Sequence, residues 1–149
     1  MTGDNDASLV GDADVHSGFV DLIGLRIVEA GPDRVVGSLE IRPSLLQPYG
    51  ILHGGVLCAM VETVGSVGAA LWFGDRGNVV GVSNSTDFIR ATRTGTLDVV
   101  ATPIHRGRTS QLWVMEITDA SQRLIARGQL RVANVADADQ LAAAPTEAS

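Results

Sequence analysis

The second half of the chain alternates between segments rich in strand-forming residues and short polar turns. The strand-like segments cover residues 78–89, 96–105, 111–118 and 124–135, and the turns between them are rich in glycine, arginine and aspartate. Turn signals at this hairpin spacing are typical of antiparallel strands that follow one another across a sheet. The pattern therefore predicts an antiparallel meander.

The first third of the chain predicts a short helix and two further strands. The helix covers residues 18–23, with Ser17 as its N-terminal cap and Gly24 as its stop. Residues 25–30 and 34–42 follow as strands around a Gly-Pro-Asp turn. The loose alternation in the second of these strands leaves its register open.

Residues 56–73 form the longest apolar segment and predict one long helix. A helix that is apolar on nearly all sides must be covered on all sides. One sheet wrapped around it would supply most of that cover, and a second copy of the chain could supply the rest. The glycine and alanine residues of the segment would let neighbouring backbone approach closely. Because it spans only 18 residues and contains Glu62, a buried core helix explains it better than a membrane span.

Together these elements predict an α+β fold in which one antiparallel sheet wraps around one long central helix. The folded domain is expected over residues 16–135, between an acidic flexible tail at 1–15 and a second flexible tail at 136–149. The net charge of −6 argues against a nucleic-acid-binding protein. A single cysteine, Cys58, and the lack of a secretory signal in the sequence are typical of a cytoplasmic protein without an internal disulfide.

Candidate chemistry is concentrated at residues 50–66, which read GILHGGVLCAMVETVGS. Gly54 and Gly55 expose backbone N–H groups at the positive end of the helix dipole, which would suit a carbonyl oxygen that becomes an oxyanion. Taken alone, the two glycines are better explained by packing at the start of the helix. His53, just before them, would either polarise a carbonyl or cap the helix.

The same helix carries a carboxylate, Glu62, which must be paired, protonated or useful if it is buried. Gly54 precedes Glu62 by eight positions, or about 12 Å along the helix axis, so one carbonyl cannot contact both groups. Two antiparallel helices related by a two-fold axis would bring Glu62 of one chain to Gly54 of the other. A catalytic Glu62 therefore requires at least a dimer. Ser66, one turn later, would orient the carboxylate or the attacking water, or would simply pack.

The turn at residues 105–110 is a second candidate site. It carries three cationic or potentially cationic side chains, and Arg90 and Arg93 are expected near it. Such a basic patch suits phosphate groups, and a solvated hairpin tip explains it equally well. The three histidines of the sequence show no metal-ligand spacing, and the sequence has neither a P-loop nor a dinucleotide fingerprint.

Three motifs occur together at defined spacings: Gln47, the segment GILHGG at 50–55 and the segment ETVGS at 62–66. This combination resembles the hotdog-fold acyl-CoA thioesterases of the PaaI-like branch. The similarity is greatest to the subgroup of the Arthrobacter-type 4-hydroxybenzoyl-CoA thioesterase and the 1,4-dihydroxy-2-naphthoyl-CoA hydrolase of menaquinone synthesis. It covers residues 18–135 approximately.

The resemblance implies a role for each residue of the helix motif. Glu62 would act as the general base or the nucleophile, and the Gly54 N–H would polarise the thioester carbonyl. Gln47 and His53 would assist at the carbonyl or thiolate end, and Ser66 would help to position water. The resemblance also implies dimers that pair into homotetramers, with each active site at a subunit interface.

The resemblance further implies that the CoA nucleotide is bound by Arg90 and by the turn residues His105, Arg106, Gly107, Arg108, Thr109 and Ser110. CoA is then part of the substrate, and no separate cofactor or metal is expected. The predicted function is hydrolysis of an acyl-CoA, with an aromatic or cyclic acyl group favoured by analogy. The alternatives are a thioesterase for acyl carrier protein, a non-hydrolytic acyl-CoA-binding or sensor protein, and a dehydratase on the same fold, for which the sequence has no Asp/His motif.

Overall fold

The computed structural model describes residues 18–136 of the chain. The predicted helices and strands are all present, and their ends lie within two residues of the expected ones. The proposed cap Ser17 and the predicted tails, apart from Ala136, lie outside the described residues. The elements in chain order are α1 (Gly18–Ile23), β1 (Arg26–Ala30), β2 (Val35–Glu40), η1 (Pro43–Leu45), α2 (Gly54–Phe73), η2 (Gly74–Arg76), β3 (Asn78–Phe88), β4 (Thr96–Arg106), β5 (Ser110–Asp119) and β6 (Leu124–Val135).

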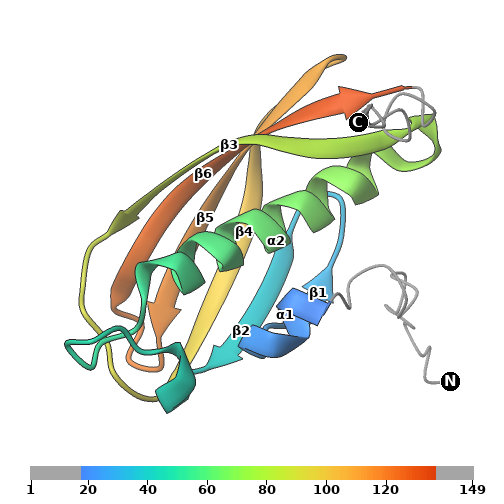
Figure 1. Ribbon diagram of the computed structural model, residues 1–149. Coiled ribbons are helices and arrows are strands. Elements are labelled where there is room, and N and C mark those ends of the chain that lie inside the picture. The colour runs from blue at the N-terminus through green and yellow to red at the C-terminus, as the bar shows by residue number, and fades with distance from the viewer. Residues whose placement is uncertain (1–17, 137–149) are drawn as a thin grey trace, which may run out of the picture.

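The strands form one antiparallel sheet in the order β1-β2-β4-β5-β6-β3 (Figure 1). The expected meander is confirmed for β4, β5 and β6, which pair in sequence order. It is wrong for β3, which pairs along its length with β6 and not with β4. Because β4 pairs with β2 on its other side, it has no free edge for β3, and β3 takes the open edge of β6.

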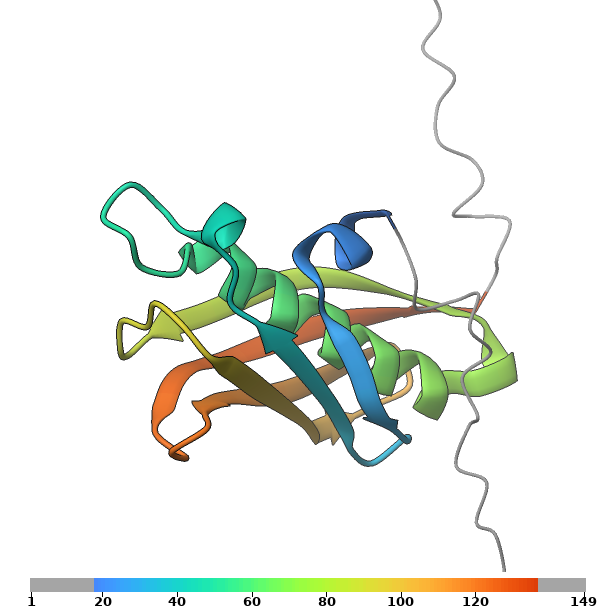
Figure 2. The same cartoon turned by 90° about the horizontal axis from the view of Figure 1, so that it is seen from below.

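Helix α2 packs lengthwise against the sheet, with β1 and β2 on one side and β3 on the other (Figure 2). The predicted arrangement of a sheet wrapped around one long helix is therefore confirmed. The large fully buried side chains Trp113 and Met115 of β5 belong to the same core cluster as the helix. The apolar side chains that α2 buries are Val56, Leu57, Met60, Val61, Val64, Ala69 and Phe73.

Two glycines of α2 allow the sheet to approach the helix closely. A Cβ atom at Gly68 would lie 2.7 Å from the indole ring of Trp113, and one at Gly65 would lie 2.8 Å from the side chain of Leu130. These contacts confirm the expectation that small residues in the helix admit neighbouring elements. They also explain why the sequence tolerates residues of poor helix propensity here.

Replacement of Gly68 by alanine is expected to destabilise the fold. The gain in helix propensity is about 1 kcal/mol, whereas overpacking of a buried site costs about 1–3 kcal/mol. The indole of Trp113 cannot easily move away, because its Nε1–H donates to Gln111 Oε1 over 2.8 Å in the core. Urea denaturation should therefore give a lower free energy of unfolding for Gly68→Ala. A stabilised variant would contradict the close packing at this glycine.

The length and composition of α2 and the following turn, residues 54–76, would also allow them to cross a membrane. Half of the most apolar window of this segment is buried inside the fold, and the buried side chains face the protein's own sheet. The structure therefore supports the prediction of a core helix.

Within residues 18–136, no segment covers the outer face of α2. Gly55, Glu62 and Ala70 of this helix are exposed, and β3 beside it forms one edge of the sheet. Val80 and Val82 on β3 are exposed as well. The sheet therefore supplies only part of the cover that an apolar helix needs, and a second copy that supplies the rest stays a prediction.

Candidate active site

His53 caps the N-terminus of α2. Its Nδ1 accepts a hydrogen bond from the Gly55 N–H over 2.8 Å, and its backbone is extended, with φ −65° and ψ 131°. Its own N–H donates to the Leu45 carbonyl over 3.0 Å, which ties the helix start to the preceding loop. Since Nδ1 is an acceptor, a neutral imidazole carries its proton on Nε2. Of the two roles considered for His53, helix cap and carbonyl polarisation, the structure shows the cap. The Nε2–H group remains able to donate to a ligand.

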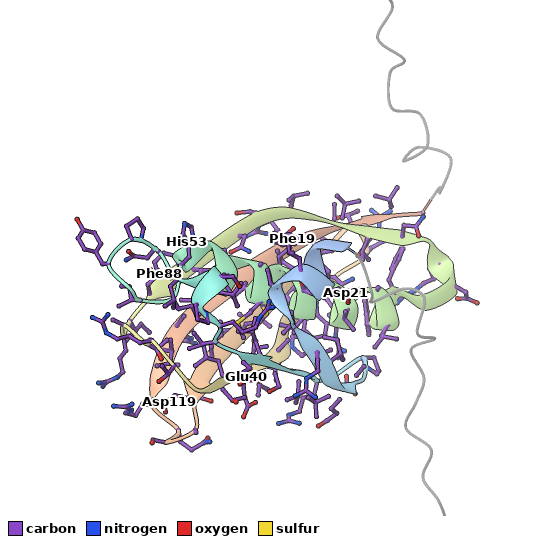
Figure 3. The ribbon with its side chains drawn as sticks, turned by 60° about the horizontal axis from the view of Figure 1, so that its bottom comes forward. Phe19, Asp21, Glu40, His53, Phe88 and Asp119 are labelled. Carbon is purple, nitrogen blue, oxygen red and sulfur yellow. The ribbon has the colours of Figure 1, made fainter. Side chains whose placement is uncertain are left out.

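The N–H of Gly54 points out of the first turn of α2, where helix geometry provides no intrahelical acceptor. The Gly54 N–H donates to no group within the described residues. The cap at His53 accepts the N–H of Gly55 and so leaves that of Gly54 free. Gly54 also packs under an aromatic ring, since a Cβ atom there would lie 2.7 Å from two carbon atoms of Phe88. Figure 3 shows His53 and Phe88 at this end of the molecule. The glycine therefore serves packing and leaves an N–H donor open.

Gln47 lines the same pocket as Gly54. The two residues line a pocket of about 310 Å³ together with Phe88 and Arg90. The Gln47 side-chain carbonyl accepts the Tyr49 N–H, so its amide NH₂ remains as a donor for a ligand. The loop at residues 47–50 is closed by a 2.8 Å hydrogen bond from the Gly50 N–H to the backbone carbonyl of Gln47. Gly50 has a positive φ of 76°, which glycine readily adopts.

Glu62 is exposed, which differs from the buried carboxylate that its apolar surroundings in the sequence suggest. It lies on the uncovered face of α2, in a cleft of about 490 Å³ whose other lining residues include Phe19, Cys58 and Asn84. Its Oε2 atom is 3.4 Å from the Asn84 amide nitrogen, and it forms no ion pair with any described residue. Exposure in the single chain removes the desolvation cost that a buried carboxylate would have.

The two halves of the predicted site are separate in one chain. Gly54 lines one pocket and Glu62 lines another, and no residue is common to both. Ser66 is half-buried one turn beyond Glu62 and lines neither pocket. The spacing of about 12 Å along the helix axis is thus preserved in the fold, and the two halves can meet only between chains.

The turn at 105–110 is held together by its neighbours. The Gly107 N–H donates to the Ser110 carbonyl over 2.9 Å, and the Asn134 amide donates to the Gly107 and Arg108 carbonyls over 2.9 and 3.2 Å. A Cβ atom at Gly107 would lie 2.7 Å from Nε2 of the exposed His105 side chain, so a larger residue there would displace that imidazole. Arg108 and Thr109 at the tip are exposed.

Arg106 is engaged within the fold. Its Nη1 donates to the Pro32 carbonyl and to Asp33 Oδ1, both over 2.8 Å, and its guanidinium lies 5.4 Å from the Trp72 ring centroid. Arg106 and Arg108 line a pocket of about 370 Å³ with Trp72 and Arg76. Arg108 forms no ion pair within the described residues, so it is the cation at this turn that is most available to a ligand.

Arg90 does not lie near this turn in the single chain. The segment 89–95 precedes β4 and the turn follows it, so the two lie at opposite ends of an 11-residue strand (Figure 1). Ten rises of about 3.3 Å make this separation about 33 Å. The expectation that Arg90 and Arg93 adjoin the turn is therefore wrong within one chain. Arg93 instead donates to the Tyr49 and Gly50 carbonyls, each over 3.1 Å.

Residues 49–126 match the family model of the thioesterase superfamily, and this segment is more than half of the chain. The chain belongs to the thioesterase superfamily. It is 32% identical over 116 residues to the 1,4-dihydroxy-2-naphthoyl-CoA hydrolase of Escherichia coli (strain K12), a match that covers 78% of this chain and 83% of that enzyme. The resemblance carried by the motifs between residues 47 and 66 is thus confirmed at the level of the family.

Solved structures support the same conclusion about this thioesterase. AziG of S. sahachiroi is 50% identical, with a TM-score of 0.80, and the match covers 81% of this chain and 98% of AziG. Thioesterase HI1161 of Haemophilus influenzae is 31% identical, with a TM-score of 0.74, and the match covers 77% of this chain and 80% of that one. The protein is a thioester hydrolase with the hotdog fold.

Three residues around Glu62 in this thioesterase were not identified from the sequence. Phe19 of α1 and Asn84 of β3 line the cleft, and a Cβ atom at Gly81 would lie 2.8 Å from Glu62 Oε1. The polar run Ser-Asn-Ser-Thr-Asp at 83–87 was a usable signal, because such residues are mostly poor strand formers and yet stand in a predicted strand.

Proposed function

We propose that this thioesterase hydrolyses an acyl-CoA with an aromatic or cyclic acyl group to a carboxylic acid and free CoA. The observation that carries the proposal concerns two groups of the same helix: within residues 18–136, the Gly54 N–H has no acceptor and the exposed Glu62 carboxylate has no ion pair. A helix N-terminus stabilises developing negative charge, and a carboxylate activates water or attacks a carbonyl. CoA belongs to the substrate, so the reaction needs no separate cofactor. An acyl-CoA substrate also fits a cytoplasmic enzyme.

Among residues 18–136, β3 is an edge strand of the sheet, and this edge supports a dimer that would join the two halves of the site. An unpaired edge strand offers a row of N–H and C=O groups to another chain, and β3 is 11 residues long. Two β3 edges paired across a two-fold axis would also set the two α2 helices antiparallel. Such a dimer would place Glu62 of the partner subunit near Gly54, and would cover the outer face of the helix. Pairing of dimers into a tetramer is part of the same proposal.

The proposed reaction begins with the thioester carbonyl oxygen on the Gly54 N–H. In one route, Glu62 of the partner subunit takes a proton from water while the water oxygen attacks the carbonyl carbon. The tetrahedral oxyanion then collapses and expels the CoA thiolate, which takes up a proton. In the other route, the carboxylate itself attacks, the CoA thiolate leaves, and water hydrolyses the mixed anhydride to the acid. Both routes use the same residues.

The remaining residues of the motif would assist around this centre. The free NH₂ of Gln47 shares a pocket with Gly54, so it would donate to the carbonyl or to the leaving thiolate. His53 would contribute its Nε2–H from the helix cap. Ser66, one turn beyond Glu62, would help to position the attacking water. The aromatic ring of Phe19 beside Glu62 supports an aromatic acyl group in this cleft.

The test is a panel of aromatic, short-chain and long-chain acyl-CoAs, with matched acyl carrier protein thioesters, scored by release of free thiol. Aromatic acyl-CoAs are expected to give the highest kcat/KM. A higher rate of thiol release from acyl carrier protein thioesters than from acyl-CoAs would identify acyl carrier protein thioesters as the substrate class. Tight binding without thiol release from any substrate would support the non-hydrolytic alternative.

The CoA nucleotide is proposed to bind at the tip of the turn at 105–110. Arg108 and Thr109 are exposed there, whereas Arg106 is paired with Asp33. His105, Gly107 and Ser110 would shape the turn and present its backbone. Because Arg90 lies at the other end of β4, it would reach the same nucleotide only from another subunit.

Replacement of Arg108 by alanine is expected to raise KM for acyl-CoA by about 5- to 150-fold, because hydrogen bonds to charged groups contribute about 1–3 kcal/mol. A truncated acyl-pantetheine thioester, which has no nucleotide, should be affected much less. Steady-state kinetics on both substrates with the same acyl group decide the matter. The loss for acyl-CoA would extend to kcat if nucleotide binding helps to place the thioester.

Arg127→Ala is the matched control for Arg108→Ala. Arg127 is also an exposed arginine, on β6, and its only ion pair among the described residues is a 3.8 Å contact with Glu116. Its removal changes the net charge by the same amount and should leave both KM values unchanged. An equal penalty for the two substrates in Arg108→Ala would assign Arg108 to the fold or the assembly.

A further inference from the structure

The carboxylate of Glu62 is bounded on one side by strand β3. The amide nitrogen of Asn84 lies 3.4 Å from Glu62 Oε2 and 2.9 Å from the Cys58 carbonyl oxygen, one turn earlier on α2. Glu62 Oε1 lies over Gly81, where a Cβ atom would come within 2.8 Å of it. One residue of β3 therefore gives the carboxylate room and another offers it a donor.

The orientation of the Asn84 amide is fixed by its neighbours. The Thr86 hydroxyl donates to Asn84 Oδ1 over 2.7 Å, while Nδ2 faces two acceptors, the Cys58 carbonyl and the Glu62 carboxylate. A flipped amide would place its oxygen against both of those oxygens, and neither of them has a proton to donate. Only one orientation is therefore compatible with the network, and it presents an N–H to Glu62.

A β-bulge brings these residues to the same face of the strand. Gly81 and Asn84 are three positions apart, so strict alternation would place them on opposite faces. The register of β3 against β6 shifts between Gly81 and Ser83, and the extra residue restores Asn84 to the helix side. Asn84 is there paired with Leu130, which is fully buried, whereas the next residue, Ser85, is exposed.

We propose that Asn84 is a positioning residue for Glu62 in the thioesterase reaction, an inference that rests on the proposed function. Its amide ties the carboxylate to the backbone of α2 and to Thr86, so that the carboxylate meets the substrate in one orientation. The 3.4 Å contact is long, as catalytic hydrogen bonds often are before substrate binds. The chemistry stays with Glu62, and Asn84 acts through it.

The charged groups near this contact are few. The described residues that line the Glu62 cleft come from α1, α2 and β3, and among these only Cys58 is titratable besides Glu62 itself. A new carboxylate at position 84 would therefore meet Glu62 directly, without a neighbouring cation within the cleft. Two carboxylates at such a distance oppose each other's ionisation.

The decisive variant is Asn84→Asp, which keeps the shape of the side chain and replaces its donor by an acceptor. At pH 7, kcat is expected to fall about tenfold, the equivalent of one lost hydrogen bond to a charged group, with KM nearly unchanged. The acid limb of the pH profile of kcat/KM is expected to move up by about one pH unit. Ser85→Asp, which adds the same charge one residue away on the exposed face, should change neither. Wild-type kcat and an unmoved acid limb in Asn84→Asp would overturn the proposal.

Thr86→Val provides an independent test that leaves Cys58, Asn84 and Glu62 in place. It removes the hydroxyl that fixes the amide, and it should lower kcat by about threefold without changing KM, because only orientation is lost. This variant decides the question if Asn84→Asp does not fold. Unchanged kcat in a folded Thr86→Val, together with loss of folding in Asn84→Asp, would assign Asn84 a structural role and overturn the proposal.

A measurement without substrate separates this proposal from the proposed function. The side-chain amide NMR signals of Asn84 are expected to shift in Glu62→Gln and to stay in place in Arg127→Ala. If the signals shift but the protein releases no thiol from any acyl-CoA, the contact between Asn84 and Glu62 is supported and the proposed function is contradicted. Unshifted signals in an active thioesterase would overturn the role of Asn84 and leave the proposed function intact.

Discussion

Replacement of Glu62 by glutamine is expected to lower kcat/KM for acyl-CoA by ~10²-fold or more, the contribution of a general base in the transition state. The amide has nearly the same volume, but at neutral pH it neither takes up a proton nor attacks a carbonyl. The fold should be unaffected, because Glu62 is exposed and makes no ion pair within the described part of the chain. Glutamine also has nearly the same helix propensity as glutamate.

The measurement combines thiol release with calorimetric binding of the same acyl-CoA. Glu62→Gln should still bind substrate, because the Gly54 pocket and the Arg108 turn are untouched. Glu116→Gln is the matched control: it neutralises another exposed carboxylate, on β5, and should keep wild-type activity. Activity of Glu62→Gln within about threefold of the wild type would contradict a role for Glu62 as base or nucleophile.

The elements of the fold could be predicted from the sequence because their signals are local. Apolar runs, glycines and turn residues marked the ends of α2 and of the strands within two residues. The pairing of β3 could not be predicted in the same way, because it depends on which edge is free once β4 has paired with β2. Hairpin signals describe only neighbours along the chain, and β3 pairs with the last strand.

The part of the candidate site that lies on α2 could be predicted from the sequence, because the spacing of residues along a helix fixes their distance. The distance between Gly54 and Glu62 is fixed by helix geometry, so the need for a second subunit followed from the sequence. The tertiary contacts around the candidate site residues could not be predicted from the sequence. Arg106 looked free for phosphate, but its partner Asp33 stands 73 positions away. Asn84 was missed because a bulge, which alternation cannot reveal, turns it toward Glu62.

The N–H of Gly54 can be removed with little other change by Gly54→Pro. Proline is favoured at the first position of a helix, and His53 before it already has the extended backbone that a residue preceding proline needs. The loss of one donor from an oxyanion site is expected to lower kcat by ~10²- to 10³-fold. The added ring atoms meet Phe88, which is 58% exposed and free to move outward.

Gly54→Ala is the control for this contact with Phe88. It adds the same Cβ atom but keeps the N–H, so it should retain far more activity than Gly54→Pro. Equal losses in the two variants, measured as kcat on one aromatic acyl-CoA, would assign the effect to displacement of Phe88. The glycine would then serve packing alone.

The Gly54→Pro chain also tests whether each site is shared between subunits. If the open N–H of one chain works with Glu62 of the partner subunit, a hybrid dimer of Gly54→Pro and Glu62→Gln chains has one site with both damaged groups and one intact site. Random mixing makes half of the dimers hybrids, so about one quarter of wild-type activity should return from two nearly inactive proteins. Hybrids demonstrated by native mass spectrometry without any recovered activity would rule out the shared site. Since about 12 Å separates the two groups within one helix, such a result would also exclude a joint action of Gly54 and Glu62 on one carbonyl.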